Sequence, residues 1–277
     1  MLHRYLLFLL LLAAVPGQAQ TSKTAAATAT EAEVLRKATE LMQDRQYESA
    51  WKLLNGFDPK HRRPAVALKQ TELALNYHLR SRELEGFGFV DLKPLERLDS
   101  LRAKYTRAAI RYPFAVELVL KNLLKQQPGN YKLNRALADY YFQVEQCQCA
   151  EADKSPATLY ALMARHYTIA HQHGQGDYSS YYKLGYARMS QTRFTESLPL
   201  FQRSIKLRPD YAPAHFHLAY SYTELKKLRP ALEEARTAAR LADTPELKYD
   251  ANFVASELER RLGIPSSTPK PEPTNKP

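Results

Sequence analysis

The stretch that decides the fold is YSSYYKLGYARMSQTRFTESLPLFQRSIKLRPD, residues 178–210, together with APAHFHLAYSYTELKKLRPALEEARTAARLAD, residues 212–243. The two segments align with a constant offset of 34 residues, which places Leu184 on Leu218. Apolar residues recur in both segments at the three- and four-residue spacing of a helix face. The repetition predicts two copies of one structural unit, each made of two antiparallel helices.

Large, small and aromatic residues recur at matching places in the two units. Small residues at Gly185, Ala219 and Ala231 suit close helix contacts, because larger side chains would push helix axes beyond about 8–10 Å. In this pattern the chain resembles the tetratricopeptide-repeat family, most strongly over residues 178–243. The resemblance rests on Tyr181, Leu184, Gly185, Phe194, Phe201 and Pro209 in the first unit, and on His215, Leu218, Ala219, Tyr222 and Ala231 in the second.

Helical periodicity continues outside these repeats, with Pro- and Gly-containing breaks and no convincing period-2 run. Only 9 of the 277 residues are glycine, well below the usual share of about 7%, which argues against a turn-dense β fold. We therefore predict an all-α, antiparallel helix-pair solenoid of about twelve helices. Residues 31–126 are expected to form a helical region with one repeat and other, degenerate ones, and the helix pairing over 64–126 stays open. Residues 127–262 are expected to hold the repeats and a C-terminal capping helix.

Two further units fit the repeat pattern less regularly, and a final helix completes the series. The N-terminal unit rests on Val34, Ala38, Leu41, Tyr47, Ala50 and Leu54. The unit over 130–170 needs an enlarged turn between its helices and rests on Leu137, Ala138, Tyr141, Met163, Tyr167 and Ala170. A terminal helix must present a polar outer face. Over 247–262 we expect an apolar side of Phe253, Val254, Leu258 and Leu262, with Glu257, Glu259, Arg260 and Arg261 elsewhere.

The two ends of the chain differ from this helical body. Residues 1–19 combine a basic start, the apolar run Leu6–Val15 and small residues up to Ala19, the pattern of a cleaved secretory signal peptide. Ten apolar residues span about 15 Å as a helix, half of the hydrocarbon core, so an uncleaved anchor is disfavoured. Residues 20–30 are expected to be a polar leader, and residues 263–277 a disordered Pro-rich tail. The sequence thus predicts an exported protein, periplasmic or extracellular, with no transmembrane segment in the mature chain.

The resemblance also implies a binding surface. In the resembled family the first helix of each unit lines a concave groove, and its fifth and ninth positions face inward. The residues at these positions are Tyr182, Tyr186, Phe216 and Tyr220, with Met189 one turn further along. Large rings with few rotatable bonds suit contacts with protein segments, although some of them would instead fill helix–helix interfaces. Family members that hold a C-terminal carboxylate use Lys and Asn here, so the aromatic residues argue against that ligand.

A second constellation, Cys147 and Cys149 with His166, His171 and His173, offers zinc-ligand residue types. The cysteines lie in the enlarged turn, whereas His171 and His173 lie at the far end of the next helix, roughly 24 Å away. Incidental thiols in an exposed loop are therefore the preferred interpretation. A metal-binding or thiol-redox module on the Cys147/Cys149 loop remains the alternative function.

The charge balance bears on the partner. The chain has 40 Lys+Arg against 29 Asp+Glu, a net charge of +11. The basic residues are scattered without a run of five, and export separates the protein from cellular nucleic acid, so a nucleic-acid partner is disfavoured. An acidic partner, an anionic envelope surface and plain solubility all fit this charge.

No catalytic signature accompanies the repeats: the sequence has no Walker loop, GxSxG elbow or HExxH motif. We expect no cofactor and no enzyme activity. The predicted function is that of an exported scaffold or adaptor in a bacterial cell envelope, which binds a protein or peptide segment in an aromatic groove.

Overall fold

Twelve α-helices and one short hairpin make up most of the part of the chain that the computed structural model describes, residues 29–81, 86–104, 113–147 and 154–265. The helices are α1 (Glu31–Gln43), α2 (Tyr47–Phe57), α3 (Pro64–Asn76), α4 (Leu98–Lys104), α5 (Val116–Gln126), α6 (Tyr131–Cys147), α7 (Pro156–Gln172), α8 (Tyr178–Ser190), α9 (Phe194–Leu207), α10 (Ala212–Glu224), α11 (Leu228–Leu241) and α12 (Pro245–Leu262). The strands are β1 (Leu79–Ser81) and β2 (Gly86–Gly88). The predicted all-α solenoid is confirmed, and the hairpin is an addition to it.

The C-terminal helices pack as consecutive pairs, α6 with α7, α8 with α9 and α10 with α11, and α12 closes the series against α11. Thr192, at φ 59°, lies in the left-handed region between α8 and α9. Lys226, at φ 60°, occupies the same conformation between α10 and α11. These two turn residues are 34 positions apart, so the sequence period is also the structural period.

The close helix approach expected at the small residues is present. A Cβ built on Gly185 would lie 2.8 Å from the ring atom Cε1 of Phe201, which is fully buried. Ala219 and Ala231, at the matching interface of the next pair, are also fully buried. The small side chains therefore set the spacing between the two helices of each pair.

The irregular units also bury their expected residues. The long helices α6 and α7 pack together, and all six positions named for this unit are fully buried: Leu137, Ala138, Tyr141, Met163, Tyr167 and Ala170. In the N-terminal unit α1 packs on α2, which buries Val34, Ala38, Tyr47, Ala50 and Leu54 and partly buries Leu41.

Residues 64–126, expected to be helical throughout, contain the β1–β2 hairpin. Its strands pair antiparallel, with Arg80 opposite Phe87. Arg102 of α4 donates hydrogen bonds to the carbonyl oxygens of His78 (3.1 Å) and Asn76 (2.8 Å), which ties α4 to the end of α3. Strands of three residues are too short to produce a period-2 pattern, so no periodicity in the sequence predicts them.

The capping helix α12 packs three of its four expected apolar residues against the core, with Leu258 buried and Val254 and Leu262 partly buried, but differs from the expectation at Phe253 and Glu259. Ala251, Ala255 and Leu258 are buried, whereas Phe253 keeps 58% of its surface exposed. Glu259, expected on the polar side, is fully buried and forms an ion pair with Arg236 of α11, at a distance of 2.9 Å. Ala251 and Ala255 lie in the interface because their small side chains let α12 approach the alanine-rich side of α11 closely.

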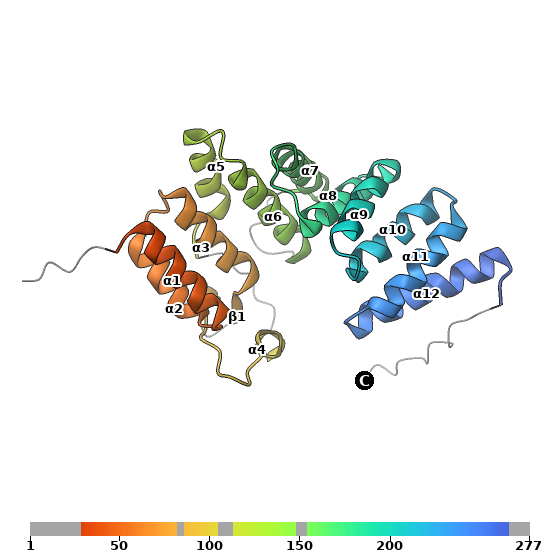
Figure 1. Ribbon diagram of the computed structural model, residues 1–277, viewed down its shortest axis with the longest axis horizontal. Helices are drawn as coiled ribbons and strands as arrows, with labels where there is room; N and C mark the ends of the chain where they lie inside the picture. The colour runs from red at the N-terminus through yellow and green to blue at the C-terminus, as the bar shows by residue number, and fades with distance from the viewer. Residues whose placement is uncertain (1–28, 82–85, 105–112, 148–153, 266–277) are drawn as a thin grey trace, which may run out of the picture.

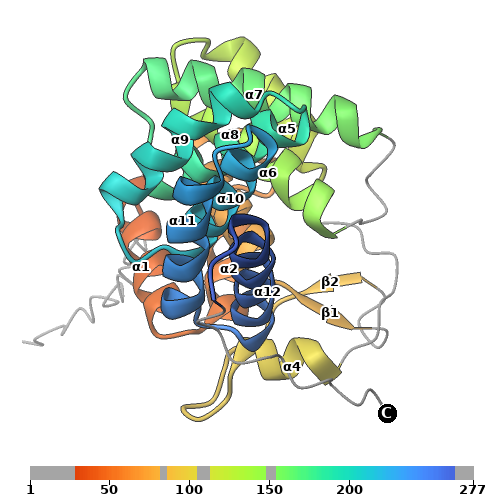
Figure 2. The same ribbon diagram turned by 90° about the vertical axis from the view of Figure 1, so that its right-hand side faces the viewer.

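The described helices form an open arch, with α1 and α2 at one end and α12 at the other (Figure 1). Seen from the C-terminal end, α12 lies in front of the other helices, and β1, β2 and α4 form a small lobe to one side (Figure 2). Among the described residues, no helix combines the length and apolar character needed to cross a membrane.

Several expectations fall outside the described residues. The signal peptide over residues 1–19, most of the leader over 20–30 and most of the tail over 263–277 belong to this group, as does Cys149. These expectations remain predictions.

Candidate functional site

The five residues predicted to line the groove lie on α8 and α10, and the structure buries them to different extents. Tyr182 is the most enclosed, with 9% of its surface exposed. Its ring meets Tyr211 edge-on at a centroid distance of 5.2 Å and His217 at 5.5 Å. Burial also raises the pKa of the Tyr182 hydroxyl and lowers the pKa of His217. Tyr182 therefore forms part of the packing beneath this surface.

Tyr186 is half-buried and joins three helices. Its hydroxyl donates to Glu145 Oε1 of α6 at 3.3 Å, and Tyr160 of α7 donates to the same oxygen at 2.7 Å. The ring lies edge-on to Phe142 at 5.7 Å. Burial and the Glu145 carboxylate both raise the pKa of Tyr186. The side chain is thus held in place by its neighbours.

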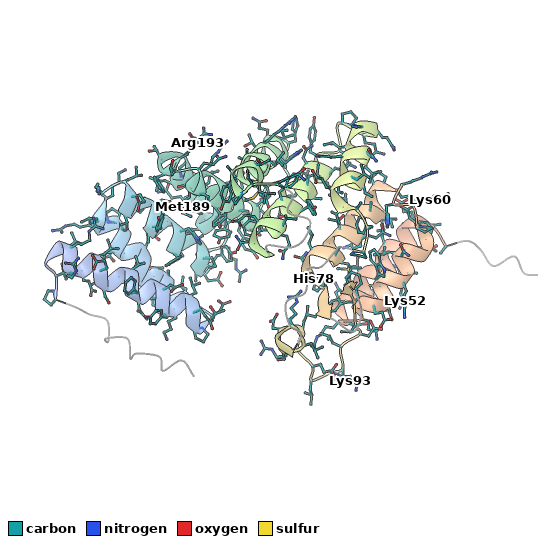
Figure 3. All side chains as sticks on the ribbon, turned by 180° about the vertical axis from the view of Figure 1, so that it is seen from behind. Lys52, Lys60, His78, Lys93, Met189 and Arg193 are labelled. Carbon is teal, nitrogen blue, oxygen red and sulfur yellow. The ribbon has the colours of Figure 1, made fainter. Side chains whose placement is uncertain are left out.

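The other three groove candidates become more open toward α10. Met189, near the end of α8 (Figure 3), packs against the cluster that contains Phe201 and Leu218. Phe216 is partly buried and lies edge-on to His217 at 5.3 Å. Tyr220 exposes 44% of its surface, which makes it the most accessible of the five. Binding by these residues remains a prediction.

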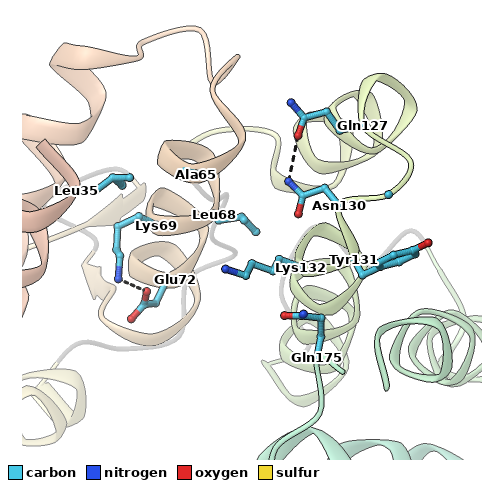
Figure 4. A pocket seen from close by; sticks show the side chains of 11 residues that line it. Leu35, Ala65, Leu68, Lys69, Glu72, Gln127, Asn130, Tyr131, Lys132 and Gln175 are labelled. Carbon is cyan, nitrogen blue, oxygen red and sulfur yellow. Dashed lines mark hydrogen bonds and ion pairs between the residues drawn. The ribbon is translucent and has the colours of Figure 1, made fainter. Parts of the chain in front are cut away.

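A hollowed part of the described surface lies along α3, α6 and the start of α8, nearer the N-terminus than the aromatic residues of α8 and α10. Two adjoining hollows of about 840 and 670 Å³ share Leu68, Glu72 and Lys132 and so form one cleft, which we call the α3–α6 cleft. α6 and α8 are first helices of successive pairs, so the cleft occupies the face on which the resemblance implies a groove. In Figure 4, Leu68 projects from α3 and Lys132 projects from α6 toward it.

The cleft combines apolar, amide and charged side chains. Its larger apolar members are Leu35, Leu68 and Leu75, and its amide members are Asn76, Gln127, Asn130, Gln143 and Gln175. Its charged members are Lys69, Lys132, Arg135 and Lys183 together with Glu72, Asp139 and Asp177. Side chains of this kind can hold an extended peptide, by hydrogen bonds to its backbone and by contacts with its apolar and charged side chains.

Most of the cleft charges neutralise one another. Asp139 accepts from Arg135 Nε at 2.9 Å and from Lys183 Nζ at 2.7 Å, and the buried Tyr167 hydroxyl donates to it at 2.7 Å. Burial by itself raises the pKa of Asp139. The positive charges of Lys183 and Arg135 lower it by more than that, so the pKa of Asp139 lies below its usual value. Arg135 also pairs with Asp177 at 3.1 Å. The network fixes the position of α8 relative to α6.

Lys132 differs from the other cations of the cleft. Lys69 pairs with Glu72 at 2.8 Å, and Arg135 and Lys183 pair with Asp139. Within the part of the chain that the structure describes, no acidic group lies within ion-pair distance of Lys132, which is exposed. Its ammonium group is therefore available to an acidic group of a bound molecule.

The histidines of the alternative metal site are engaged in packing. His166 Nδ1 hydrogen-bonds Asn134 Oδ1 at 2.9 Å, and His171 Nε2 hydrogen-bonds Ser180 Oγ at 2.9 Å. Burial is the main cause that lowers the pKa of each to about 4. His173 stacks on Tyr131 at 3.4 Å. No group of three or more potential metal ligands occurs among the described residues. The Cys147/Cys149 loop itself lies largely outside them, so its redox role is untested.

Sequence reasoning missed the α3–α6 cleft for two reasons. Its α3 wall lies in the region whose helix pairing could not be fixed. Its α6 wall, formed by Lys132, Arg135 and Asp139, looks like an ordinary solvated helix face. Carrying the groove positions over to α6 as well as to α8 and α10 would have pointed to these residues.

Comparison with known proteins identifies the repeat. The tetratricopeptide-repeat family model matches residues 178–211, which confirms the predicted resemblance where it is strongest. None of the curated proteins compared with the chain matches it. A solved structure of MamA (AMB-1) is 18% identical over 76% of this chain and 96% of that one, with a TM-score of 0.48. YrrB, described as a TPR protein with an unusual peptide-binding site, is 15% identical over 53% of this chain and 68% of that one, with a TM-score of 0.44.

Proposed function

We propose that this chain is a non-catalytic scaffold that binds a segment of another protein in the α3–α6 cleft, and that it acts after export. The observation that carries the proposal is the continuous cleft on the first-helix face, with Lys132, which has no ion-pair partner among the described residues, at the point where its two hollows join. Helix-pair solenoids present extended surfaces of this kind to their partners.

The cleft lining supports a particular kind of segment. Leu35, Leu68 and Leu75 offer contacts to an apolar side chain, and Lys132 offers a charge to an acidic one. The net charge of +11 would speed the approach of an acidic partner. The partner we propose is therefore an extended segment that carries both acidic and apolar residues.

The aromatic residues of α8 and α10 would extend this surface. Tyr220 is open enough to contact a partner that continues past α8, whereas Tyr182 would support the surface from beneath. In this arrangement the bound segment runs from the α3–α6 cleft toward α10.

Affinity capture from a cell-envelope extract tests the binding proposal. The immobilised chain should retain a defined partner, and Lys132→Glu should reduce the retained amount about tenfold or more. Lys206→Glu is the matched control, because it makes the same charge change at an exposed lysine of α9, on a second helix. Equal retention by the two variants would show that the cleft is not the binding site.

The export proposal rests on the signal-peptide pattern of residues 1–19. Fractionation of cells that express the full chain should recover the protein outside the cytoplasm, with an N-terminus close to Gln20. Recovery in the cytoplasm with the first residues intact would contradict export.

A further inference from the structure

The outer face of the capping helix α12 carries exposed aromatic side chains where a polar surface was expected. Tyr249 and Phe253 expose 48% and 58% of their surfaces, on the side of the helix opposite to the buried Ala251, Ala255 and Leu258. In Figure 2, α12 lies at the front of the molecule. A terminal repeat normally ends in a polar face, so these rings call for an explanation.

These rings belong to a regular stripe. Glu246, Tyr249, Phe253, Glu257 and Arg260 follow one another at spacings of three or four residues, which is the spacing of a helix–helix contact seam. Phe253 lies at the middle of the 18-residue helix Pro245–Leu262. The helix is acidic in its first turn and basic in its last turn.

The stripe is complementary to itself when read in the opposite direction. Two copies of α12 packed antiparallel about a twofold axis at Phe253 bring together residues at equal distances on either side of it. Glu246, seven residues before Phe253, then faces Arg260 of the second copy, seven residues after it. Tyr249, four residues before, faces Glu257 of the second copy, four residues after. In a contact with twofold symmetry, each of these pairings occurs two times.

The charged residues at the two ends of the stripe, Glu246 and Arg260, can take part in such a contact. Arg260 donates hydrogen bonds to the Glu257 carboxylate on the same face, from Nη2 at 2.6 Å and from Nε at 2.9 Å. These bonds orient its guanidinium group along the stripe. Glu246 is exposed and has no ion-pair partner among the described residues. Antiparallel packing would supply that partner.

We infer that the outer face of α12 is a self-association surface, and that its occupant is the α12 of a second copy of this chain, packed antiparallel about Phe253. The inference is independent of the proposed cleft function, because α12 contributes no residue to the cleft. A single helix pair is a small interface, so association in the micromolar range is expected.

Sedimentation equilibrium of the purified full chain, at concentrations from about 1 to 100 µM, tests the inference. The wild-type chain should shift from one to two chain masses across this range. Phe253→Glu should remain at one chain mass with an unchanged circular dichroism spectrum. Leu118→Glu is the control, because Leu118 is equally exposed, at 59%, but lies on α5; it should dimerise like the wild type. A wild-type chain that stays monomeric throughout would overturn the inference.

A charge exchange tests the antiparallel geometry. Glu246→Arg and Arg260→Glu should each weaken dimerisation about tenfold, because each puts like charges opposite one another twice. The double variant should restore dimerisation to within about threefold of the wild type, since both pairs are rebuilt with reversed sign. Single variants that dimerise normally, or a double variant that fails to recover, would overturn the antiparallel arrangement.

Discussion

Replacing Gly185 by alanine should destabilise the solenoid, although alanine is the better helix former. The added Cβ would lie 2.8 Å from Cε1 and 2.9 Å from Cδ1 of the Phe201 ring. These separations are shorter than ordinary carbon contacts, and Phe201 is fully buried, so the ring has no open space to move into. Overpacking of this kind costs about 2–3 kcal/mol, whereas the higher helix propensity of alanine returns about 1 kcal/mol. We expect a net loss of about 1–2 kcal/mol.

Urea unfolding followed by circular dichroism measures this loss, and Gly56→Ala provides the matched control. Gly56 lies within α2, and a Cβ there would meet no atom within 4 Å. The control should therefore gain up to about 1 kcal/mol. In the double variant Gly185→Ala with Phe201→Leu, the two losses should be less than additive, because the smaller side chain makes room for the methyl group. A Gly185→Ala protein as stable as the wild type would refute the close helix approach.

Three further perturbations separate the parts of the fold. Leu218→Ala should cost about 2–5 kcal/mol, because Leu218 is 1% exposed, whereas Tyr220→Ala should cost less than about 1 kcal/mol; thermal unfolding of both variants compares them. Arg236→Ala should cost about 2 kcal/mol or more, because it removes an ion-pair partner of the buried Glu259 carboxylate, and Arg236→Lys should restore part of the loss. His166 should make the protein less stable in acid: its pKa is about 4 when folded against 6.5 for the free group, so only the unfolded chain gains the proton as pH falls below 6.5. Between pH 7 and pH 5, urea titrations should show a loss of stability that is about 2 kcal/mol smaller in His166→Gln than in the wild type, the remaining loss including the similar contribution of His171; an equal loss in the two proteins would contradict the assignment.

The repeat architecture could be predicted because its sequence signals are local and redundant. The 34-residue offset is visible in the residues themselves, and the structure repeats it in the turn residues Thr192 and Lys226. Gly185 also predicted a close contact between helices, because a glycine within a helix is destabilising unless such a contact requires it. Periodicity and small residues together thus determine where the helix pairs form.

The remaining features depend on contacts that no local pattern shows. Phe253 was assigned to the apolar side of α12 by its own character, yet it lies on the exposed side, and the small Ala251 and Ala255 join Leu258 in the interface with the rest of the fold. The α3–α6 cleft arises where helices distant in sequence lie side by side. Its lining residue Lys132 has no distinctive neighbours along the chain, so only the three-dimensional arrangement reveals it.

Site-specific photo-crosslinking tests the central claim, binding in the α3–α6 cleft, most directly. A photoreactive amino acid is placed at Lys132 or, in a separate protein, at Lys206, and each is expressed in full-length form in the native cell. The cleft account predicts one discrete crosslinked product from position 132 and none from position 206, with the product lost when Leu68→Asp disrupts the opposite wall. A product of the same size from both positions, or from position 206 alone, would contradict it.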